Sequence, residues 1–339
     1  MRAMILCAGL GTRLRPLTNR WPKPAIPLLG QPLFRYNLSV LRTAGVRAVG
    51  INTHHLPEVM RACAEAECVR MGLDLQVVHE PVIQGTGGGI RGLRRFLEDD
   101  HFVVLNGDIL FAIDLVPIVA EHRESGAAAT MVLLPMPQNE SYAAVELDAQ
   151  QRVRRIAGHG PGGERLSPWH FSGVHVMSPA VFDFMSPGGE EDINRQVYVR
   201  MIEEGLTVRG HIVQAYWSDL GTPARYLQAQ TDLLFGQVPL AALHGANPFE
   251  GAVREGKLSW RHPSAQLNGA GVVGPAFFDA GATVDPTARV ASGAYVGADA
   301  HVGAHARLGR CTVLEGTRVR DGEELVDVIA WGDERIPAG

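Results

Sequence analysis

The sequence is short of the features that mark membrane, secreted and nucleic-acid-binding proteins. Its 339 residues include four cysteines and no CxxC pair, so we expect reduced thiols in a cytoplasmic protein rather than a disulfide framework. There is no apolar run of the roughly 18 residues that span a membrane, and the apolar N-terminal stretch is too short for a signal sequence. The net charge of −5 offers no basic surface for nucleic acid. We therefore expect neither a membrane nor a nucleic acid as partner.

Lysine is also scarce. Among 31 basic residues the only lysines are Lys23 and Lys257, and all the others are arginines. What the chain has in quantity is ordinary for a globular protein: 46% hydrophobic and 20% charged residues. Its length predicts two domains, or one large domain with an appendage.

Up to about residue 235, short apolar runs alternate with helical patterns. This alternation predicts an α/β fold, a Rossmann-like and mostly parallel sheet that binds its ligand at the carboxyl ends of the strands. An antiparallel hairpin at 143–147 and 153–156 interrupts the alternation. We expect strands at 3–7, 48–52, 75–79, 102–105, 128–134 and 208–216, and helices at 32–44, 57–71, 89–97, 114–125, 193–204 and 223–235.

After a linker at 236–265 the period changes to six. Large side chains recur at every sixth position, with alanine two places before most of them, and in a strand such positions share a face. Period six predicts a short left-handed parallel β-helix of hexapeptide repeats over 266–331, following a catalytic domain at 1–235. The large side chains are Val272, Phe278, Val284, Val290, Val296, Val302, Leu308 and Leu314.

The first expected strand runs into a glycine-rich and cationic segment, AGLGTRLRPLTNRWPKPAIP. Gly9 and Gly11 lack a Cβ, so backbone N–H groups there can approach an anion closely. Arg13 and Lys23 follow, and a chain that otherwise uses arginine has placed one of its two lysines here. The segment lacks the Gly-Lys-Ser/Thr of a P-loop and the GxGxxG of a dinucleotide site. It predicts a polyphosphate site of another kind.

With three further motifs, this segment resembles the sugar-1-phosphate nucleotidyltransferases, or NDP-sugar pyrophosphorylases. The second glycine loop of that family is matched by Gln84–Ile90, its metal-binding turn by Asn106-Gly107-Asp108, and its late Asp motif by Trp217–Pro223. The likeness covers residues 1–235, and a hexapeptide β-helix also occurs in the family. The activity implied is condensation of a sugar 1-phosphate with an NTP to give an NDP-sugar and pyrophosphate.

The resemblance also implies roles for residues of this chain. Arg13 and Lys23 are the expected catalytic cations, and Asp108 and Asp219 the expected Mg²⁺ ligands, because hard oxygens bridging to phosphates suit that ion. The expected nucleotide-binding residues are Ala8, Gly9, Gly11, Thr12, Glu80, Gly85 and Thr86. The expected sugar-binding residues are Asn106, Gly107, Phe171, Ser172 and Gly173.

The identity of the substrates is less constrained. A carboxylate accepts hydrogen bonds, and guanine offers an N1–H and N2–H₂ pair, so Glu80 favours GTP unless it only caps or faces solvent. The β-helix and the flanking motifs resemble mannose-1-phosphate guanylyltransferase homologues. The short loop Thr86–Gly89 also resembles the uridylyltransferase that acts on N-acetylmuramate 1-phosphate. The family's Glu-Lys-Pro triplet is replaced by Ala157-Gly158-His159, so its usual sugar-phosphate clamp is not implied.

Two alternatives of other classes remain. The β-helix carries His301 and His305, and some hexapeptide proteins are acyltransferases with a histidine at the coil edge. A regulatory homologue without catalysis is the other alternative, against which the presence of both cations and both aspartates argues. A homo-oligomer is possible because β-helix flanks commonly pack against copies of themselves.

Overall fold

The computed structural model describes residues 1–138, 140, 142–256 and 259–338, so Lys257 lies outside the described residues. Among those residues no helix has both the length and the apolar character needed to cross a membrane. The chain divides into two compact units, each described here by itself. The first comprises Met1–Leu10, Trp21–Ala25 and Phe34–Trp217, and the second Gly11–Arg20, Ile26–Leu33 and the chain from Ser218.

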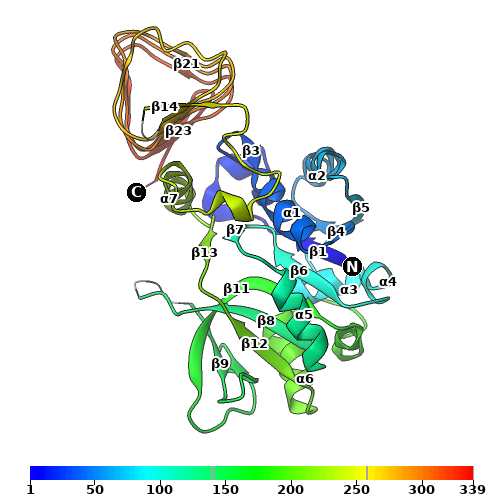
Figure 1. Cartoon of the computed structure of the whole chain (residues 1–339). Helices are drawn as coiled ribbons and strands as arrows, with labels where there is room; N and C mark the ends of the chain where they lie inside the picture. Colours follow the sequence, from blue (N-terminus) through cyan, green and yellow to red (C-terminus); the bar gives the residue numbers. More distant parts are fainter. Residues whose placement is uncertain (139, 141, 257–258, 339) are drawn as a thin grey trace. The chain divides into compact units, whose positions relative to one another are not determined.

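A mixed sheet of nine strands forms the centre of the first unit (Figure 1). Its parallel part has the order β6-β1-β4-β5, and β12 pairs in parallel with β8. The strand β11 runs antiparallel between β6 and β8. These strands are β1 (Arg2–Leu6), β4 (Ala48–Thr53), β5 (Asp74–His79), β6 (Phe102–Asn106), β8 (Ala129–Leu134), β11 (Ser167–Met177) and β12 (Val208–Ile212), with the hairpin β9 (Ala144–Leu147) and β10 (Val153–Ile156). The predicted α/β fold and its hairpin are confirmed.

Buried apolar side chains explain why these segments are strands. Met4 of β1 and Phe102 and Val104 of β6 are fully buried and share one core cluster. The helices that follow the strands are α1 (Leu33–Thr43), α2 (Pro57–Met71), α3 (Gly85–Gly92), α4 (Arg94–Leu97), α5 (Val116–Ser125) and α6 (Tyr198–Glu203). Proline begins α2, and Gly72, at φ +67°, ends it in the left-handed conformation that glycine tolerates.

Three elements differ from the prediction. The helix expected at 89–97 is two helices and begins at Gly85, because glycines rather than apolar residues form its first turn. The helix expected at 193–204 opens with a π turn, Ile193–Val197. The strand expected at 208–216 ends at Ile212, and Tyr216–Asp219 forms a separate strand, β13.

The C-terminal part of the second unit is a parallel β-helix, drawn in yellow to red in Figure 1. Ala276 pairs with Ala294 and Val284 with Val302, three hexapeptides apart, so one coil consists of three repeats. The ladder side chains from Phe278 to Leu308 and the alanines before them are buried, as predicted. Three sheets form its faces. The parallel strands of the first are β15 (Ser259–Arg261), β17 (Ala276–Phe278), β20 (Ala294–Val296), β23 (Cys311–Val313) and β26 (Val328–Trp331). The second consists of β16 (Gly271–Val272), β19 (Arg289–Val290), β22 (Arg307–Leu308) and β25 (Glu324–Leu325), and the third of β18 (Thr283–Val284), β21 (His301–Val302) and β24 (Arg318–Val319).

The prediction of an unbroken period up to Leu314 was wrong. Val296 pairs with Val313, one residue short of three hexapeptides, so Val313 holds the next ladder position. Leu314 is also buried, although it does not hold a ladder position. A single residue is missing between Leu308 and Cys311, where the chain turns between sheets and one residue fewer still closes the coil.

The residues predicted as a linker already join the stack. The strand β14 (Val253–Glu255) pairs antiparallel with β15, and β15 pairs in parallel with β17, so parallel pairing begins at Trp260. The helix α7 (Pro223–Leu234) belongs to the same unit, where the buried amide of Gln230 donates to the backbone oxygens of Gly293 and Cys311. The proposed boundary at residue 235 stays a prediction.

We expect the ladder to dominate the stability of the β-helix. Leu308 is 2% exposed and stacks between Val290 and Leu325. Truncation in Leu308→Ala should cost about 2–5 kcal/mol of unfolding free energy, through lost burial and the cavity left behind. Val273→Ala is the control, because that side chain is 72% exposed and should shift stability by less than about 0.5 kcal/mol. Denaturant unfolding measures both, and equal effects would contradict the ladder assignment.

Candidate active site

A cavity of about 270 Å³ opens in the first unit where β1, β4, β5 and β6 end. This is the edge at which an open α/β sheet binds its ligand. The predicted site residues that line it are Ala8, Gly9, Lys23, Glu80, Gly85, Thr86, Asn106 and Asp108, and the other lining residues are Leu6, Cys7, Pro24, Asn52 and Ile83. The structure therefore brings together both predicted glycine loops and the predicted metal-binding turn.

The first glycine loop leaves β1 at Leu6 and reaches into the second unit. Apart from its two chain neighbours, none of the residues that the structure describes lies within 4 Å of where a Cβ on Gly9 would be, which leaves space that a ligand can fill. Gly11 has φ +60° and precedes a 3-10 turn, Thr12–Leu14, and its oxygen accepts a hydrogen bond from Thr18 Oγ1 at 2.9 Å. Thr12 and Arg13 are exposed on that turn.

Two of the residues that line the cavity form an ion pair. Lys23 Nζ lies 2.5 Å from Asp108 Oδ2, and the side chains are 11% and 37% exposed. Lys23 sits on the short turn Lys23–Ala25, and Asp108 follows β6 directly. The cavity lining thus includes a nearly buried ammonium beside one carboxylate, a compact positive charge that suits an anionic ligand.

Asn52, at the end of β4, links the two glycine loops, a role the sequence analysis missed. Its Oδ1 accepts a hydrogen bond from the Cys7 backbone N–H at 2.9 Å, and its Nδ2 donates to Glu80 Oε1 at 2.8 Å. Glu80 Oε2 in turn accepts from the Gln84 N–H at 3.0 Å. The one available signal was position, because Asn52 is a polar residue at the carboxyl end of a buried strand. Burial raises the pKa of the Cys7 thiol well above its ordinary value. The thiol therefore stays protonated and lines the cavity without acting as a nucleophile.

Glu80 does not face solvent, which was one of the roles left open for it. It is 5% exposed, and each carboxylate oxygen accepts one hydrogen bond within the protein. Each oxygen also keeps a second lone pair. Base recognition by Glu80 therefore stays a prediction, now for a carboxylate held rigidly at the cavity wall.

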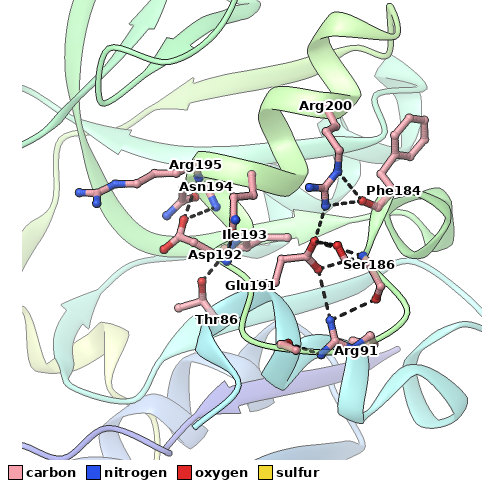
Figure 2. Close-up of polar contacts among 12 residues, drawn as sticks. Thr86, Arg91, Phe184, Ser186, Glu191, Asp192, Ile193, Asn194, Arg195 and Arg200 are labelled. Carbon is pink, nitrogen blue, oxygen red and sulfur yellow. Dashed lines mark hydrogen bonds and ion pairs between the residues drawn. The ribbon is translucent and has the colours of Figure 1, made fainter.

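The second glycine loop is held by residues from another part of the chain, as Figure 2 shows. The Glu191 oxygen accepts hydrogen bonds from the N–H groups of Gly87 at 2.8 Å and Gly88 at 3.3 Å. Thr86 Oγ1 accepts from the Ile193 N–H at 2.9 Å. The amides of Gly87 and Gly88 are engaged within the protein, so they are not available as donors to a ligand in the cavity. A Cβ on Gly85, at φ +70°, would lie 2.5 Å from the Glu191 oxygen, so only glycine fits there.

Of the predicted sugar-binding residues, Gly173 approaches Asn106 closely. A Cβ on Gly173 would lie 2.9 Å from Asn106 Nδ2, and Gly173, at φ +89°, sits in an irregularity of β11. A Cβ on Gly107 would lie 2.6 Å from the Leu6 oxygen. The hydroxyl of Ser172 donates to the Val132 backbone oxygen, and the backbone oxygen of Ser172 accepts from Trp217 Nε1.

The ring of Phe171 packs on His175, with 4.5 Å between their centroids. Of the predicted sugar-binding set, Asn106 alone lines the cavity. Phe171, Ser172, Gly173 and Gly107 do not line it, and the roles of all five toward a sugar stay predictions.

Arg13 and Asp219 meet at Gly221 in the second unit. A Cβ on Gly221 would lie 3.0 Å from Asp219 Oδ1 and 3.2 Å from Arg13 Nη2. Both oxygens of Asp219 lie 2.5 Å from Arg225 Nη1, a partner that the sequence analysis missed. Arg225 is in the first turn of α7, six residues after Asp219. The signal in the sequence was an arginine in the first turn of the helix that follows the Asp motif.

The donor set fits Mg²⁺ that arrives with a nucleotide. Within the described ranges, no three His, Cys, Asp or Glu side chains form a group that could hold a metal ion. Asp108 nevertheless offers a partly exposed carboxylate in the cavity. Mg²⁺ commonly binds one or two carboxylates together with phosphates and water, so a preformed protein cage is not required.

Comparison with known proteins identifies the family. Residues 2–235 match the family model described as nucleotidyl transferase. The chain is 32% identical to mannose-1-phosphate guanylyltransferase of Mycobacterium tuberculosis, over 85% of this chain and 77% of that protein. It is 28% identical to a UTP–glucose-1-phosphate uridylyltransferase of Synechocystis, over 98% of this chain and 87% of the relative.

Solved structures share the fold. HddC from Yersinia pseudotuberculosis superposes with a TM-score of 0.56 at 20% identity, covering 68% of this chain and 97% of its own. A putative glucose-1-phosphate thymidylyltransferase from Bacillus anthracis gives 0.57 at 21% identity, with 76% and 98% covered. The match over 2–235, together with the motifs that this region carries, shows that the chain belongs to the nucleotidyl transferase family, as its resemblance to the sugar-1-phosphate nucleotidyltransferases predicted.

Proposed function

We propose that the protein condenses mannose 1-phosphate with GTP to give GDP-mannose and pyrophosphate. In this reaction an oxygen of the sugar phosphate attacks the α-phosphorus of the NTP. The bond from that phosphorus to the oxygen bridging to the β-phosphate breaks, and pyrophosphate leaves with the electron pair. The observation that carries the proposal is the Lys23–Asp108 pair in a cavity walled by two glycine loops, within a chain of this family.

The chemistry needs charge stabilisation more than proton transfer, because the nucleophile is already an ionised phosphate. Lys23 would leave Asp108 for the phosphate oxygens and hold the two anions together. Arg13 would stabilise the leaving pyrophosphate. Asp108 and Asp219 would hold Mg²⁺, which when bound screens the negative charge of the phosphates. Asn52 and Glu80 would keep the two loops at a fixed separation.

The choice of substrates rests on two observations. Glu80 presents a buried acceptor to the cavity, which suits the N–H pair of guanine better than the single donor of uracil. Relatives named mannose-1-phosphate guanylyltransferase also recur, in Mycobacterium tuberculosis, Xenopus tropicalis and Schizosaccharomyces pombe. Two other substrate pairs are alternatives to mannose 1-phosphate with GTP. One is glucose 1-phosphate with UTP, after the Synechocystis relative, and the other is N-acetylmuramate 1-phosphate with UTP.

A substrate panel tests the proposal. Pyrophosphate release is measured for ATP, GTP, UTP and dTTP against mannose, glucose and N-acetylmuramate 1-phosphates with Mg²⁺. We expect kcat/KM to be highest for GTP with mannose 1-phosphate, by about tenfold over either UTP pair, as one or two hydrogen bonds to a base allow. EDTA should abolish release. A preference for UTP would overturn the substrate assignment, and acyl transfer without pyrophosphate release would overturn the class.

A further inference from the structure

A buried carboxylate outside the cavity anchors the second glycine loop. The side chain of Glu191 is 2% exposed, in the segment between a 3-10 turn, Pro179–Phe184, and the π turn. Its oxygens accept hydrogen bonds from Ser186 Oγ at 2.7 Å and from the Ser186 N–H at 3.1 and 3.2 Å. Arg91 approaches at 3.4 Å, and Arg200 also donates to it (Figure 2).

Such a group is stable only with partners. A carboxylate taken out of water pays a desolvation cost of several kcal/mol unless charges and donors surround it. Burial alone would raise the pKa of Glu191, but the hydrogen bonds from Ser186 and Arg200 outweigh it and hold that pKa below its ordinary value. Glu191 is therefore ionised at neutral pH and fixed by two arginines and a serine.

The backbone of the same residue contacts the glycine loop. Its N–H donates to the Gln84 oxygen at 2.9 Å, and its oxygen accepts from Gly87 and Gly88. The adjoining Gly85 and Thr86 line the cavity. Gly85 packs directly against the Glu191 oxygen, so a displacement of Glu191 also displaces the cavity wall.

Arg91 ties the other end of α3 to the same segment. It donates to the Gly189 oxygen at 2.6 Å and the Ser186 oxygen at 3.2 Å, in addition to approaching Glu191. The helix α3 is thus attached at its first turn by the Glu191 backbone and at its last turn through Arg91. One residue, Glu191, is common to both attachments, through its backbone at the first turn and through its carboxylate at the last.

We propose that Glu191 is a positioning residue for the nucleotide: its buried ion cluster fixes the glycine loop so that Gly85 and Thr86 meet the bound NTP. The inference rests on the proposed function for the identity of the ligand. Glu191 does not line the cavity, so its effect on the NTP acts through the loop.

The test compares Glu191→Gln with Glu67→Gln. Both changes remove the charge of a nearly buried carboxylate beside two arginines, since Glu67 is 8% exposed and pairs with Arg35 and Arg70. Glu67 lies on α2 and does not line the cavity. Both variants should unfold at lower temperature than the wild type, which matches them for stability loss.

The kinetic and binding constants separate the two variants. For Glu191→Gln we expect the Kd of GTP, measured calorimetrically with Mg²⁺, and its KM to rise about tenfold, while the KM of the sugar 1-phosphate changes less than twofold. Amide hydrogen exchange at Gly87 and Gly88 should accelerate. Glu67→Gln should leave all of these unchanged. Unchanged GTP affinity and exchange in folded Glu191→Gln, or equal changes in both variants, would overturn the proposal.

A milder variant covers the case in which Glu191→Gln does not fold. Ser186→Ala removes one donor to Glu191 and keeps both arginines, and we expect a two- to threefold rise in the Kd of GTP with the same acceleration of exchange. An unchanged Kd in Ser186→Ala would then count against the proposal. GTP binding and exchange are read without turnover, so a wild type that binds GTP but forms no NDP-sugar would refute the proposed function alone.

Discussion

Replacement of Lys23 by arginine is expected to lower kcat/KM for NDP-sugar formation by about a hundredfold. The side chain is 11% exposed and its ammonium lies 2.5 Å from Asp108, so the cavity is fitted to a compact point charge. A guanidinium is wider and planar, and it would keep a bidentate contact with Asp108 instead of turning to the phosphates. The loss corresponds to about 2.7 kcal/mol of transition-state stabilisation.

Lys23→Ala separates shape from charge in the same assay. If position matters as much as charge, Lys23→Arg should be nearly as impaired as Lys23→Ala, with both variants folded by circular dichroism. Kinetics of Lys23→Arg close to the wild type would show that any cation suffices, and Lys23 would lose its assigned role.

Asp108→Asn is expected to lower kcat by about 10²–10³-fold, the effect of removing one electrostatic group from a transition state. The change keeps the shape of the side chain and removes the charge that Mg²⁺ requires. Because the Lys23 side chain is 11% exposed and loses its charged partner, the change should also cost about 1–3 kcal/mol of unfolding free energy. Titration of the rate with Mg²⁺ should show a higher half-saturation concentration than in the wild type.

Asp219→Asn forms the second arm of the metal experiment. The carboxylate of Asp219 is held by Arg225 in the second unit, and we expect the same loss of metal-dependent turnover. Wild-type activity of Asp219→Asn beside an inactive Asp108→Asn would leave Asp108 as the sole protein ligand. Wild-type activity of both variants would remove the metal assignment entirely.

Local patterns in the sequence predicted most of the fold. Proline and Gly72 bound α2 at the predicted residues, and the period of six predicted the β-helix, because both signals act within a few residues. The slip at Val313 was not predictable, since Leu314 continues the period in sequence and only the pairing of coils shows the missing residue.

The candidate site was predictable where it rests on motifs and not where it rests on distant contacts. Gly9, Lys23 and Asp108 lie in recognisable segments, and the structure places all three on one cavity. Asn52 and Glu191 lie outside every motif that the sequence analysis singled out. Their importance comes from partners far away in the chain, such as Glu80 for Asn52 and Gly87 for Glu191, which only the fold brings near.

Isotope transfer tests the central claim most directly. Mannose 1-phosphate labelled with ¹⁸O in its non-bridging phosphate oxygens is incubated with the wild-type protein, GTP and Mg²⁺, and the products are followed by ³¹P NMR. The account predicts that all of the label enters GDP-mannose, one labelled oxygen bridging its two phosphates, with an equal amount of unlabelled pyrophosphate. Label in pyrophosphate, release of orthophosphate in place of pyrophosphate, or no reaction with any NTP and sugar 1-phosphate of the panel would contradict it.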